Sequence, residues 1–178
     1  PSYEFYDTYA PLSSKLLLSE LTQDVAELLP ALGEDLRHKL GTATTGKVVF
    51  HSPCTLQHGL KVRGAVEALL TSLGATVVPV GESHFCCGSA GTYNLLQPEL
   101  AGQLRERKLE NIASVKPDLI ATGNIGCITQ LERGSAVPVV HTIELLDWAT
   151  GGPCPKPLEK LKDKVHPIES LMELAGAR

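Results

Sequence analysis

Apolar residues near the start of the chain recur at the spacing of one helical face. They follow one another at steps of three or four residues, as Leu21, Val25, Leu28, Leu32, Leu36 and Leu40. Pro30 indicates a kink in this stretch, and Gly41 indicates where it ends. We therefore expect a helical N-terminal segment over residues 13–40.

From residue 46 onward, short β-branched runs alternate with helical stretches. Residues 47–51 predict a strand bounded by Gly46 and Pro53, and the apolar spacing over residues 62–73 predicts a helix. The same alternation continues with predicted strands at 76–80, 118–122 and 137–140 and predicted helices at 98–115, 127–132 and 142–149. Strands that alternate with helices indicate a parallel sheet covered on both faces.

These elements predict an α/β fold of three layers, with helices on both faces of a four-stranded parallel sheet, plus the N-terminal helical segment. Pro79 lies inside the second predicted strand, and it lacks the N–H that a central strand needs, so this strand is placed at an edge. Right-handed crossovers then favour the strand order 2-1-3-4, with a switch point between the first and third strands. We expect one domain over residues 1–150 and a C-terminal tail with a short helix over residues 151–178.

Length and charge restrict the possible functions. The 178 residues are 43% hydrophobic, which is enough for one core. The formal net charge is −4 and the basic residues are scattered, so we expect no nucleic-acid partner. No apolar run reaches the roughly 18–20 residues of a membrane span, and residues 1–10 lack the pattern of a signal peptide. We expect a soluble, cytoplasmic chain that is a fragment or a processed product, because it starts at Pro1.

Four of the five cysteines lie directly after predicted strands. Cys54, the adjacent pair Cys86 and Cys87, and Cys127 should meet at one edge of the sheet, where neighbouring strands are about 4.8 Å apart. Adjacent cysteines form a poor disulfide pair, and thiols in a reducing compartment more often bind metals or carry redox chemistry. The alternative is that they are inert core cysteines, which would have no reason to gather at one end of three strands.

Four converging thiols suit an iron–sulfur cluster, with zinc as the alternative cofactor. The candidate ligands are Cys54, Cys86, Cys87 and Cys127. Gly88 and Gly91 would let the backbone approach the cluster and donate N–H groups to its sulfurs. The dipole of the helix that begins near Cys127 would favour the thiolate of that residue.

The histidines near these cysteines are further candidates. His51 and His84 flank the cysteine segments, and each could ligate a metal, donate a hydrogen bond to sulfur or cap a strand end. His58 is interpreted as a cap or surface residue. Cys154 follows the last predicted helix in the stretch GGPCPKP and is left outside the site.

Three segments resemble the cysteine-rich CCG domain that is shared by heterodisulfide reductase B subunits, lactate-utilisation proteins and anaerobic glycerol-phosphate dehydrogenase C subunits. They are HSPCTLQHG at 51–59, ESHFCCGSAGTYNLLQPELAGQLRERKLENI at 82–112 and GNIGCITQL at 123–131. Within this family they are most similar to the C-terminal CCG domain of glycolate oxidase iron–sulfur subunits. The resemblance covers residues 45–150 strongly and the N-terminal helices more weakly, which makes the expected domain a CCG-type cysteine-rich domain.

The resemblance implies an electron-transfer domain within a glycolate oxidase, or 2-hydroxy-acid dehydrogenase, complex. Such a domain would relay electrons from a flavin-containing subunit, which would bind the FAD, toward a membrane acceptor. It also implies an upstream ferredoxin-like domain in the full-length protein, because this chain lacks a run of closely spaced cysteines. We expect no turnover by the domain alone, and a location in the cytoplasm, peripheral at the inner face of the membrane through its complex.

One position departs from the family pattern. The family has a Cys-x-x-Cys pair where this chain has Asn124 and Cys127. Four thiolates fit a [4Fe–4S] cluster or a lone metal ion better than a five-thiolate, non-cubane cluster. We expect Asn124 to border the same cleft, where its amide can donate a hydrogen bond to a sulfur atom.

Two other function classes remain open. A zinc-binding structural or interaction module would use the same four cysteines without redox chemistry. A thiol-based redox domain or a cysteine-nucleophile enzyme would instead pair one thiolate with His51 or His84. One nucleophile does not need four cysteines at one edge, and GSAGTY at 88–93 lacks the Gly-Lys-Ser/Thr of a phosphate loop.

Overall fold

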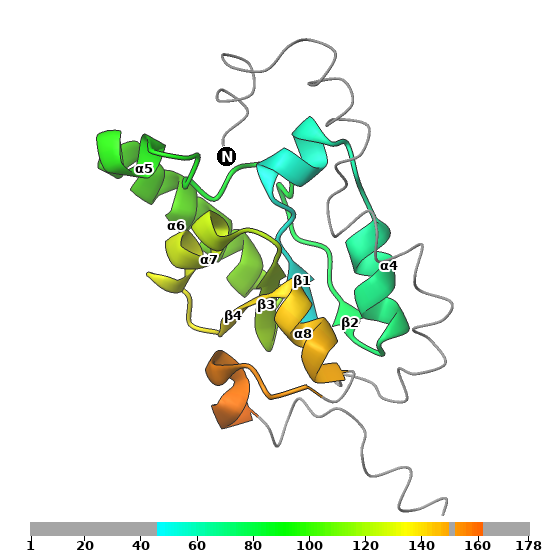
Figure 1. Cartoon of the computed structure of the whole chain (residues 1–178). Coiled ribbons are helices and arrows are strands. Elements are labelled where there is room, and N and C mark those ends of the chain that lie inside the picture. Colours follow the sequence, from blue (N-terminus) through cyan, green and yellow to red (C-terminus); the bar gives the residue numbers. More distant parts are fainter. Residues whose placement is uncertain (1–45, 150–151, 162–178) are drawn as a thin grey trace, which may run out of the picture.

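A computed structural model of the protein describes residues 46–149 and 152–161, so the helical segment predicted over 13–40 lies outside the described residues. Four parallel strands form one sheet, namely β1 (Lys47–Phe50), β2 (Thr76–Val77), β3 (Leu119–Thr122) and β4 (Val139–His141). Their order is β2-β1-β3-β4, with the reversal between β1 and β3 (Figure 1). The predicted α/β fold and strand order are confirmed.

Helices connect the strands and cover the sheet on both faces (Figure 1). The longer ones are α4 (Ala65–Ser72), α6 (Pro98–Ser114), α7 (Ile125–Glu132) and α8 (Thr142–Ala149). The shorter ones are the π-helical turn η1 (Thr55–Gly59), α5 (Tyr93–Leu96) and the 3₁₀ helix η2 (Lys156–Leu161). The spacing-based prediction is confirmed for α8 at both ends, whereas α7 begins two residues earlier than predicted.

The edge strand β2 is shorter than the predicted run 76–80. Thr76 and Val77 pair with Lys47 and Val48 of β1, and the N–H of Val78 still donates to the carbonyl of Val48 at 2.9 Å. The donors to β1 are Thr76 and Val78, so the missing N–H of Pro79 faces the open edge of the sheet. Its ring fixes φ at about −65°, away from the value of about −120° in a parallel strand, and the strand ends before it. The chain therefore leaves the sheet early and enters the loop that carries the adjacent cysteines.

The two faces of the sheet carry two separate hydrophobic clusters. Successive side chains of a strand point to opposite faces. In β3, Leu119 and Ala121 therefore lie in one cluster and Ile120 lies in the other. The first cluster contains residues of α4 and α8 together with Leu158 of η2. The second contains residues of α6 and α7 together with Cys87 and Cys127, so part of the candidate site is built into the core.

Within the described ranges 46–149 and 152–161, none of the helices has both the length and the apolar character needed to cross a membrane.

Candidate metal centre

The four predicted cysteine ligands lie after three strands of one parallel sheet. Cys54 immediately precedes η1, Cys86 and Cys87 lie in the loop between β2 and α5, and Cys127 lies in the first turn of α7. Their thiols interact in sequence, Cys54 with Cys86, Cys86 with Cys87, and Cys87 with Cys127. All four are free thiols, and Cys87 and Cys127 are buried. The parallel topology thus brings together the sulfur atoms of distant residues.

Gly88 allows the cysteine loop to pack directly on α6. Its φ is +92°, and a Cβ at this position would collide with the backbone carbonyl of Ala101. Its N–H donates to the Sγ of Cys86 at 3.3 Å. Gly91 has a φ of +64° but open space around its Cβ position, so it serves the turn of the chain rather than a close approach.

Asn124 has a structural role that sequence reasoning did not predict. It is the N-cap of α7, and its Oδ1 accepts hydrogen bonds from the N–H groups of Gly126 at 2.9 Å and Cys127 at 3.2 Å. The amide side chain therefore fixes the helical turn that carries Cys127. The signal was present in the sequence, because Asn is favoured immediately before the first turn of a helix.

His51 joins two of the cysteines in a compact group of ligand atoms. One ring nitrogen of His51 and the Sγ atoms of Cys87 and Cys127 all lie within 4.8 Å of one another. The backbone N–H of His51 donates to the carbonyl of Ala121 at 2.8 Å, which fixes the residue at the end of β1. The side chain is 4% exposed, and its Nε2 has no hydrogen-bond partner among the described residues. Such a buried, unpaired nitrogen suits a metal ligand.

His84 and His58, the other histidines near the cysteine segments, lie on the surface. The ring of His84 packs on the ring of Phe85 with 4.7 Å between centroids, and His84 is exposed. Its backbone carbonyl accepts a hydrogen bond from Nε2 of the exposed His58 at 3.1 Å. His84 is not part of the compact group that His51 forms with the cysteines.

Burial and crowding keep the metal-free thiols of Cys54, Cys86 and Cys87 protonated. Burial, then the neighbouring Cys86, raise the pKa of Cys54 to about 11. The hydrogen bond with Cys127 is the main cause that raises the pKa of Cys87 to about 11, and the pKa of Cys86 is raised chiefly by its hydrogen bond with Cys87. Burial, followed by the charge of Lys108, lowers the pKa of His51 to about 4. A metal ion that binds here would displace the thiol protons into the solvent, whereas the imidazole of His51 is already neutral, as a ligand must be.

This electrostatic pattern opposes a nucleophilic role for Cys54, Cys86 and Cys87. A cysteine nucleophile needs a lowered thiol pKa and a histidine that can accept its proton. Here the thiol pKa values of Cys54, Cys86 and Cys87 are raised, and the pKa of His51 is lowered. The donor set instead fits a thiolate-bound metal or iron–sulfur centre, since cysteine thiolates and imidazole nitrogen are the usual ligands of both.

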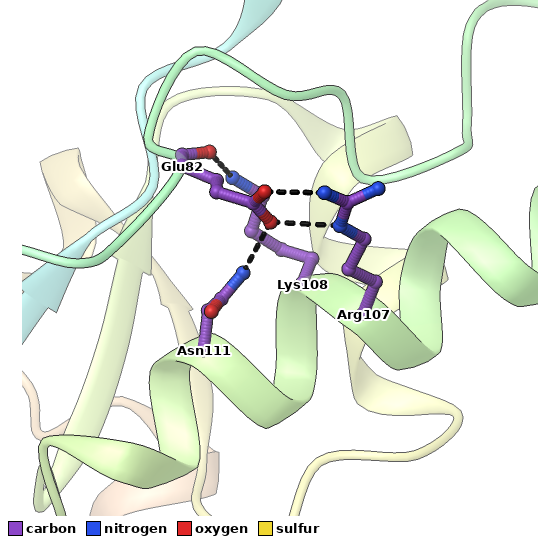
Figure 2. Close-up of polar contacts among 4 residues, drawn as sticks. All are labelled: Glu82, Arg107, Lys108 and Asn111. Carbon is purple, nitrogen blue, oxygen red and sulfur yellow. Dashed lines mark hydrogen bonds and ion pairs between the residues drawn. The ribbon is translucent and has the colours of Figure 1, made fainter.

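Lys108 is a residue of this region that sequence reasoning missed. Its side chain is 2% exposed on the inner face of α6, between Ala101 and Ile112. Its Nζ donates to the backbone carbonyl of Glu82 at 2.7 Å (Figure 2). The positions 101, 108 and 112 share one helical face, so the spacing contained the signal that this lysine points inward.

Comparison with known proteins places the site in a recognised domain. Residues 48–132 match the family model CCG, described as a cysteine-rich domain. The glycolate oxidase iron-sulfur subunit of Escherichia coli (strain K12) is 47% identical over 132 residues, which cover 74% of this chain and 32% of that protein. Lactate utilization protein A of Oceanobacillus iheyensis is 28% identical over 134 residues, covering 72% of this chain and 52% of that protein.

A second protein of the latter name gives a similar match. Lactate utilization protein A of Anoxybacillus flavithermus is 29% identical over 134 residues, which cover 72% of this chain and 54% of that protein. The chain thus spans about a third of the glycolate oxidase subunit and about half of the two lactate utilization proteins. The four cysteines, His51 and Lys108 all fall inside the matched range 48–132.

Proposed function

Because residues 48–132 belong to the cysteine-rich CCG domain family, we propose that this chain is the iron–sulfur, electron-transfer domain of a complex that oxidises a 2-hydroxy acid such as glycolate. The observation that carries the proposal is the meeting of four free thiols and a buried, unpaired histidine at one sheet edge. The 47% identity to a glycolate oxidase iron-sulfur subunit supports the choice of iron–sulfur chemistry and of this class of complex.

In this proposal Cys54, Cys86, Cys87 and Cys127 hold a [4Fe–4S] cluster, which when bound supplies one-electron transfer. Four thiolates suffice for that cluster type, and Asn124 takes the place of a further family cysteine. The N–H of Gly88 already donates to the Sγ of Cys86, a contact that would stabilise the bound thiolate.

His51 has two possible roles in this centre, and both depend on its position. It lies within 4.8 Å of the Cys87 and Cys127 sulfurs and is neutral at physiological pH because its pKa is lowered to about 4. A neutral imidazole can ligate a metal through its free nitrogen or can donate a hydrogen bond to a sulfur. We assign it beside the cluster. With four thiolates on the four irons, its role is a hydrogen bond to a sulfur, whereas ligation through the unpaired Nε2 applies to a centre that uses fewer of the cysteines.

The remaining parts of the electron path are proposed to lie outside this chain. A flavin-containing subunit that binds FAD would deliver electrons from the hydroxy acid, and an upstream ferredoxin-like domain of the same full-length protein would exchange electrons with this centre. The complex would operate on the cytoplasmic side of the membrane. The domain itself contributes the thiol ligands and the buried surroundings, so it is proposed to be inactive in turnover by itself.

A zinc-binding module is the second candidate, and one observation favours it. The buried group of His51, Cys87 and Cys127 supplies one nitrogen and two sulfur ligands, a combination typical of structural zinc sites. In that case Cys54 or Cys86 would complete a tetrahedral site, and the domain would have an architectural role without electron transfer.

The two candidates are separated by the metal content of the chain after anaerobic purification. Iron, acid-labile sulfide and zinc are quantified, and the sample is reduced while paramagnetic resonance is recorded. The iron–sulfur proposal predicts iron and sulfide in similar amounts, and a resonance signal that changes on one-electron reduction. Zinc without sulfide, after iron and sulfide have been supplied anaerobically, would contradict the proposal and support the zinc module.

A further inference from the structure

Lys108 is buried, and among the described residues its ammonium group forms no hydrogen bond with a carboxylate. The side chain is 2% exposed, and a lysine is almost never buried to this degree unless it is paired. The hydrogen bond of its Nζ goes to the uncharged carbonyl of Glu82. The ammonium carries three N–H bonds and this carbonyl accepts one of them.

The carboxylate of Glu82 is engaged by other groups. Nε of Arg107 donates to its Oε2 at 2.8 Å, and the second guanidinium nitrogen of Arg107 contacts its Oε1. Nδ2 of Asn111 donates to Oε2 at 2.9 Å. Figure 2 shows Arg107 and Asn111 converging on the carboxylate while Lys108 reaches the carbonyl. The Glu82 carboxylate is thus hydrogen-bonded to Arg107 and Asn111, and it acts on the charge of Lys108 only through space.

The same contacts hold the cysteine loop along α6. The guanidinium carbon of Arg107 lies 4.6 Å from the ring centroid of Phe85, and Gly88 packs on the backbone of Ala101. Glu82 has a φ of +53°, which is uncommon for a residue other than glycine and persists where the surroundings determine the conformation. The loop from Glu82 to Gly88 therefore meets α6 at several points on either side of Lys108, and the two adjacent cysteines lie in that loop.

The charge of Lys108 acts on the thiol groups of the site. Burial lowers the pKa of Lys108, and the negative charges of Cys87, Glu82, Cys54 and Cys86 act against this shift by favouring the ammonium form. When these cysteines bind a metal centre as thiolates, several negative charges gather in a largely buried environment. Opposite charges attract more strongly there than in water, since the effective dielectric constant is lower.

From this geometry we propose that Lys108 is a positioning residue of the metal centre: a fixed buried cation, held on the Glu82 carbonyl, that compensates the thiolate ligands and raises the reduction potential of the bound cluster. The inference rests on the proposed iron–sulfur function. One electron added to the cluster increases its negative charge, and a nearby cation stabilises that reduced form more than the oxidised form. The electron comes from the external reductant of the titration, and Lys108 neither gains nor loses a proton in this role.

The test is a redox titration of the full chain, reconstituted anaerobically with iron and sulfide. Lys108→Met removes the charge while keeping a long side chain, and Lys108→Gln removes the charge but keeps an N–H donor. Lys160→Met is the matched control, because Lys160 is exposed in η2. At a fixed electrode potential, we expect the ratio of reduced to oxidised cluster to fall about tenfold or more in both Lys108 variants, which corresponds to about 59 mV. The control should retain the wild-type ratio.

A second readout tests the same cation without a cluster. Zinc is titrated into the metal-free chain in competition with a chelator, and we expect about tenfold weaker binding in Lys108→Met and Lys108→Gln than in Lys160→Met. Wild-type potentials and zinc affinities in both Lys108 variants, at full metal content, would overturn the inference. The wild type could fail to assemble a cluster while its zinc binding still depends on Lys108. That result would refute the iron–sulfur function and leave the role of Lys108 at the metal centre standing.

Discussion

Gly88 meets two structural demands that no other residue type satisfies together. Its φ of +92° lies outside the range that L side chains adopt easily, and its Cβ position coincides with the Ala101 carbonyl of α6. Gly91 in the same loop has a φ of +64° but open space around it. Substituting alanine at Gly91 therefore measures the effect of backbone strain alone, and substituting it at Gly88 measures strain and collision together.

We expect Gly88→Ala to lower the free energy of unfolding by about 2–5 kcal/mol, from backbone strain and overpacking combined. Gly91→Ala should cost about 1–2 kcal/mol, because only the backbone term applies. Chemical denaturation of the metal-free chain measures both. Equal losses for the two variants would show that Gly88 does not pack on α6 as described.

Asn124 is the N-cap of α7, and it lies at the position where the resemblance to CCG domains implies a further cysteine. Asn124→Ala and Asn124→Cys should each lower the free energy of unfolding of the metal-free chain by about 1 kcal/mol, because both remove the acceptor for the N–H groups of Gly126 and Cys127. Thermal denaturation provides the measurement.

The same two variants answer a separate question once the cluster is present. Only Asn124→Cys adds a thiolate, whose negative charge would favour the oxidised form. We therefore expect it to change the paramagnetic resonance spectrum or lower the reduction potential, while Asn124→Ala leaves both close to wild type. Identical spectra and potentials in all three proteins would place residue 124 beyond the reach of the cluster.

The raised thiol pKa values predict how the metal-free chain responds to pH. The pKa values of Cys54 and Cys87 rise from 9.0 to about 11 in the folded protein. Between these values the unfolded chain has already released protons that the folded chain retains, so stability falls as pH rises. We expect the free energy of unfolding to decrease from pH 9 to pH 11. The double variant Cys54→Ser/Cys87→Ser should show a flatter curve there, and an identical decline in both proteins would argue against buried, crowded thiols.

At the scale of elements, η2 is an integral part of the core. Leu158 is fully buried in the cluster that contains Trp148 and Leu145 of α8. Leu158→Ala should lower the free energy of unfolding by about 2–5 kcal/mol, as expected for a fully buried leucine. Leu100→Ala, on the exposed face of α6 at 48% exposure, is the control and should change stability little. A negligible effect at Leu158 would instead support a domain that ends near residue 150.

The elements that the sequence predicts well are those with a strong local signal. The apolar spacing over 142–149 matches α8, and Pro98 marks the start of α6. The end of β2 after Val77 agrees with the fixed φ of Pro79, a constraint that the β-branched pattern alone does not show. Local sequence patterns show where a helix or strand lies, but the length of a strand also depends on its pairing with neighbouring strands.

The sequence predicts those features of the candidate site that follow from the order of strands and helices. It does not predict those that depend on how side chains pack. Cysteines after parallel strands must approach one edge, so their grouping follows from the element order. Lys108 was missed because a helical lysine usually faces solvent, and its inward direction depends on how α6 packs against the Glu82 loop. The sequence likewise assigns the same candidate roles to His51 and His84, whereas the fold buries His51 and exposes His84.

At the scale of the whole molecule, the sheet separates two regions with different roles. One face carries a large apolar core with Trp148 and Leu158, against which Cys154 packs. The other face and the strand ends carry Cys87, Cys127 and the loop held by α6. This division predicts that the first face supports a stable fold while the second one determines metal binding. The fifth cysteine is therefore a matched control for the four at the sheet edge.

Anaerobic reconstitution of cysteine variants tests the central claim most directly. The full chain, the double variant Cys86→Ser/Cys87→Ser and the single variant Cys154→Ser are supplied with iron and sulfide under identical conditions, and broad absorption near about 400 nm is recorded. We predict that the wild type and Cys154→Ser acquire this absorption with matching iron and sulfide contents, whereas the double variant does not. The same chromophore and iron content in the double variant would contradict the assignment of the metal centre to this edge of the sheet.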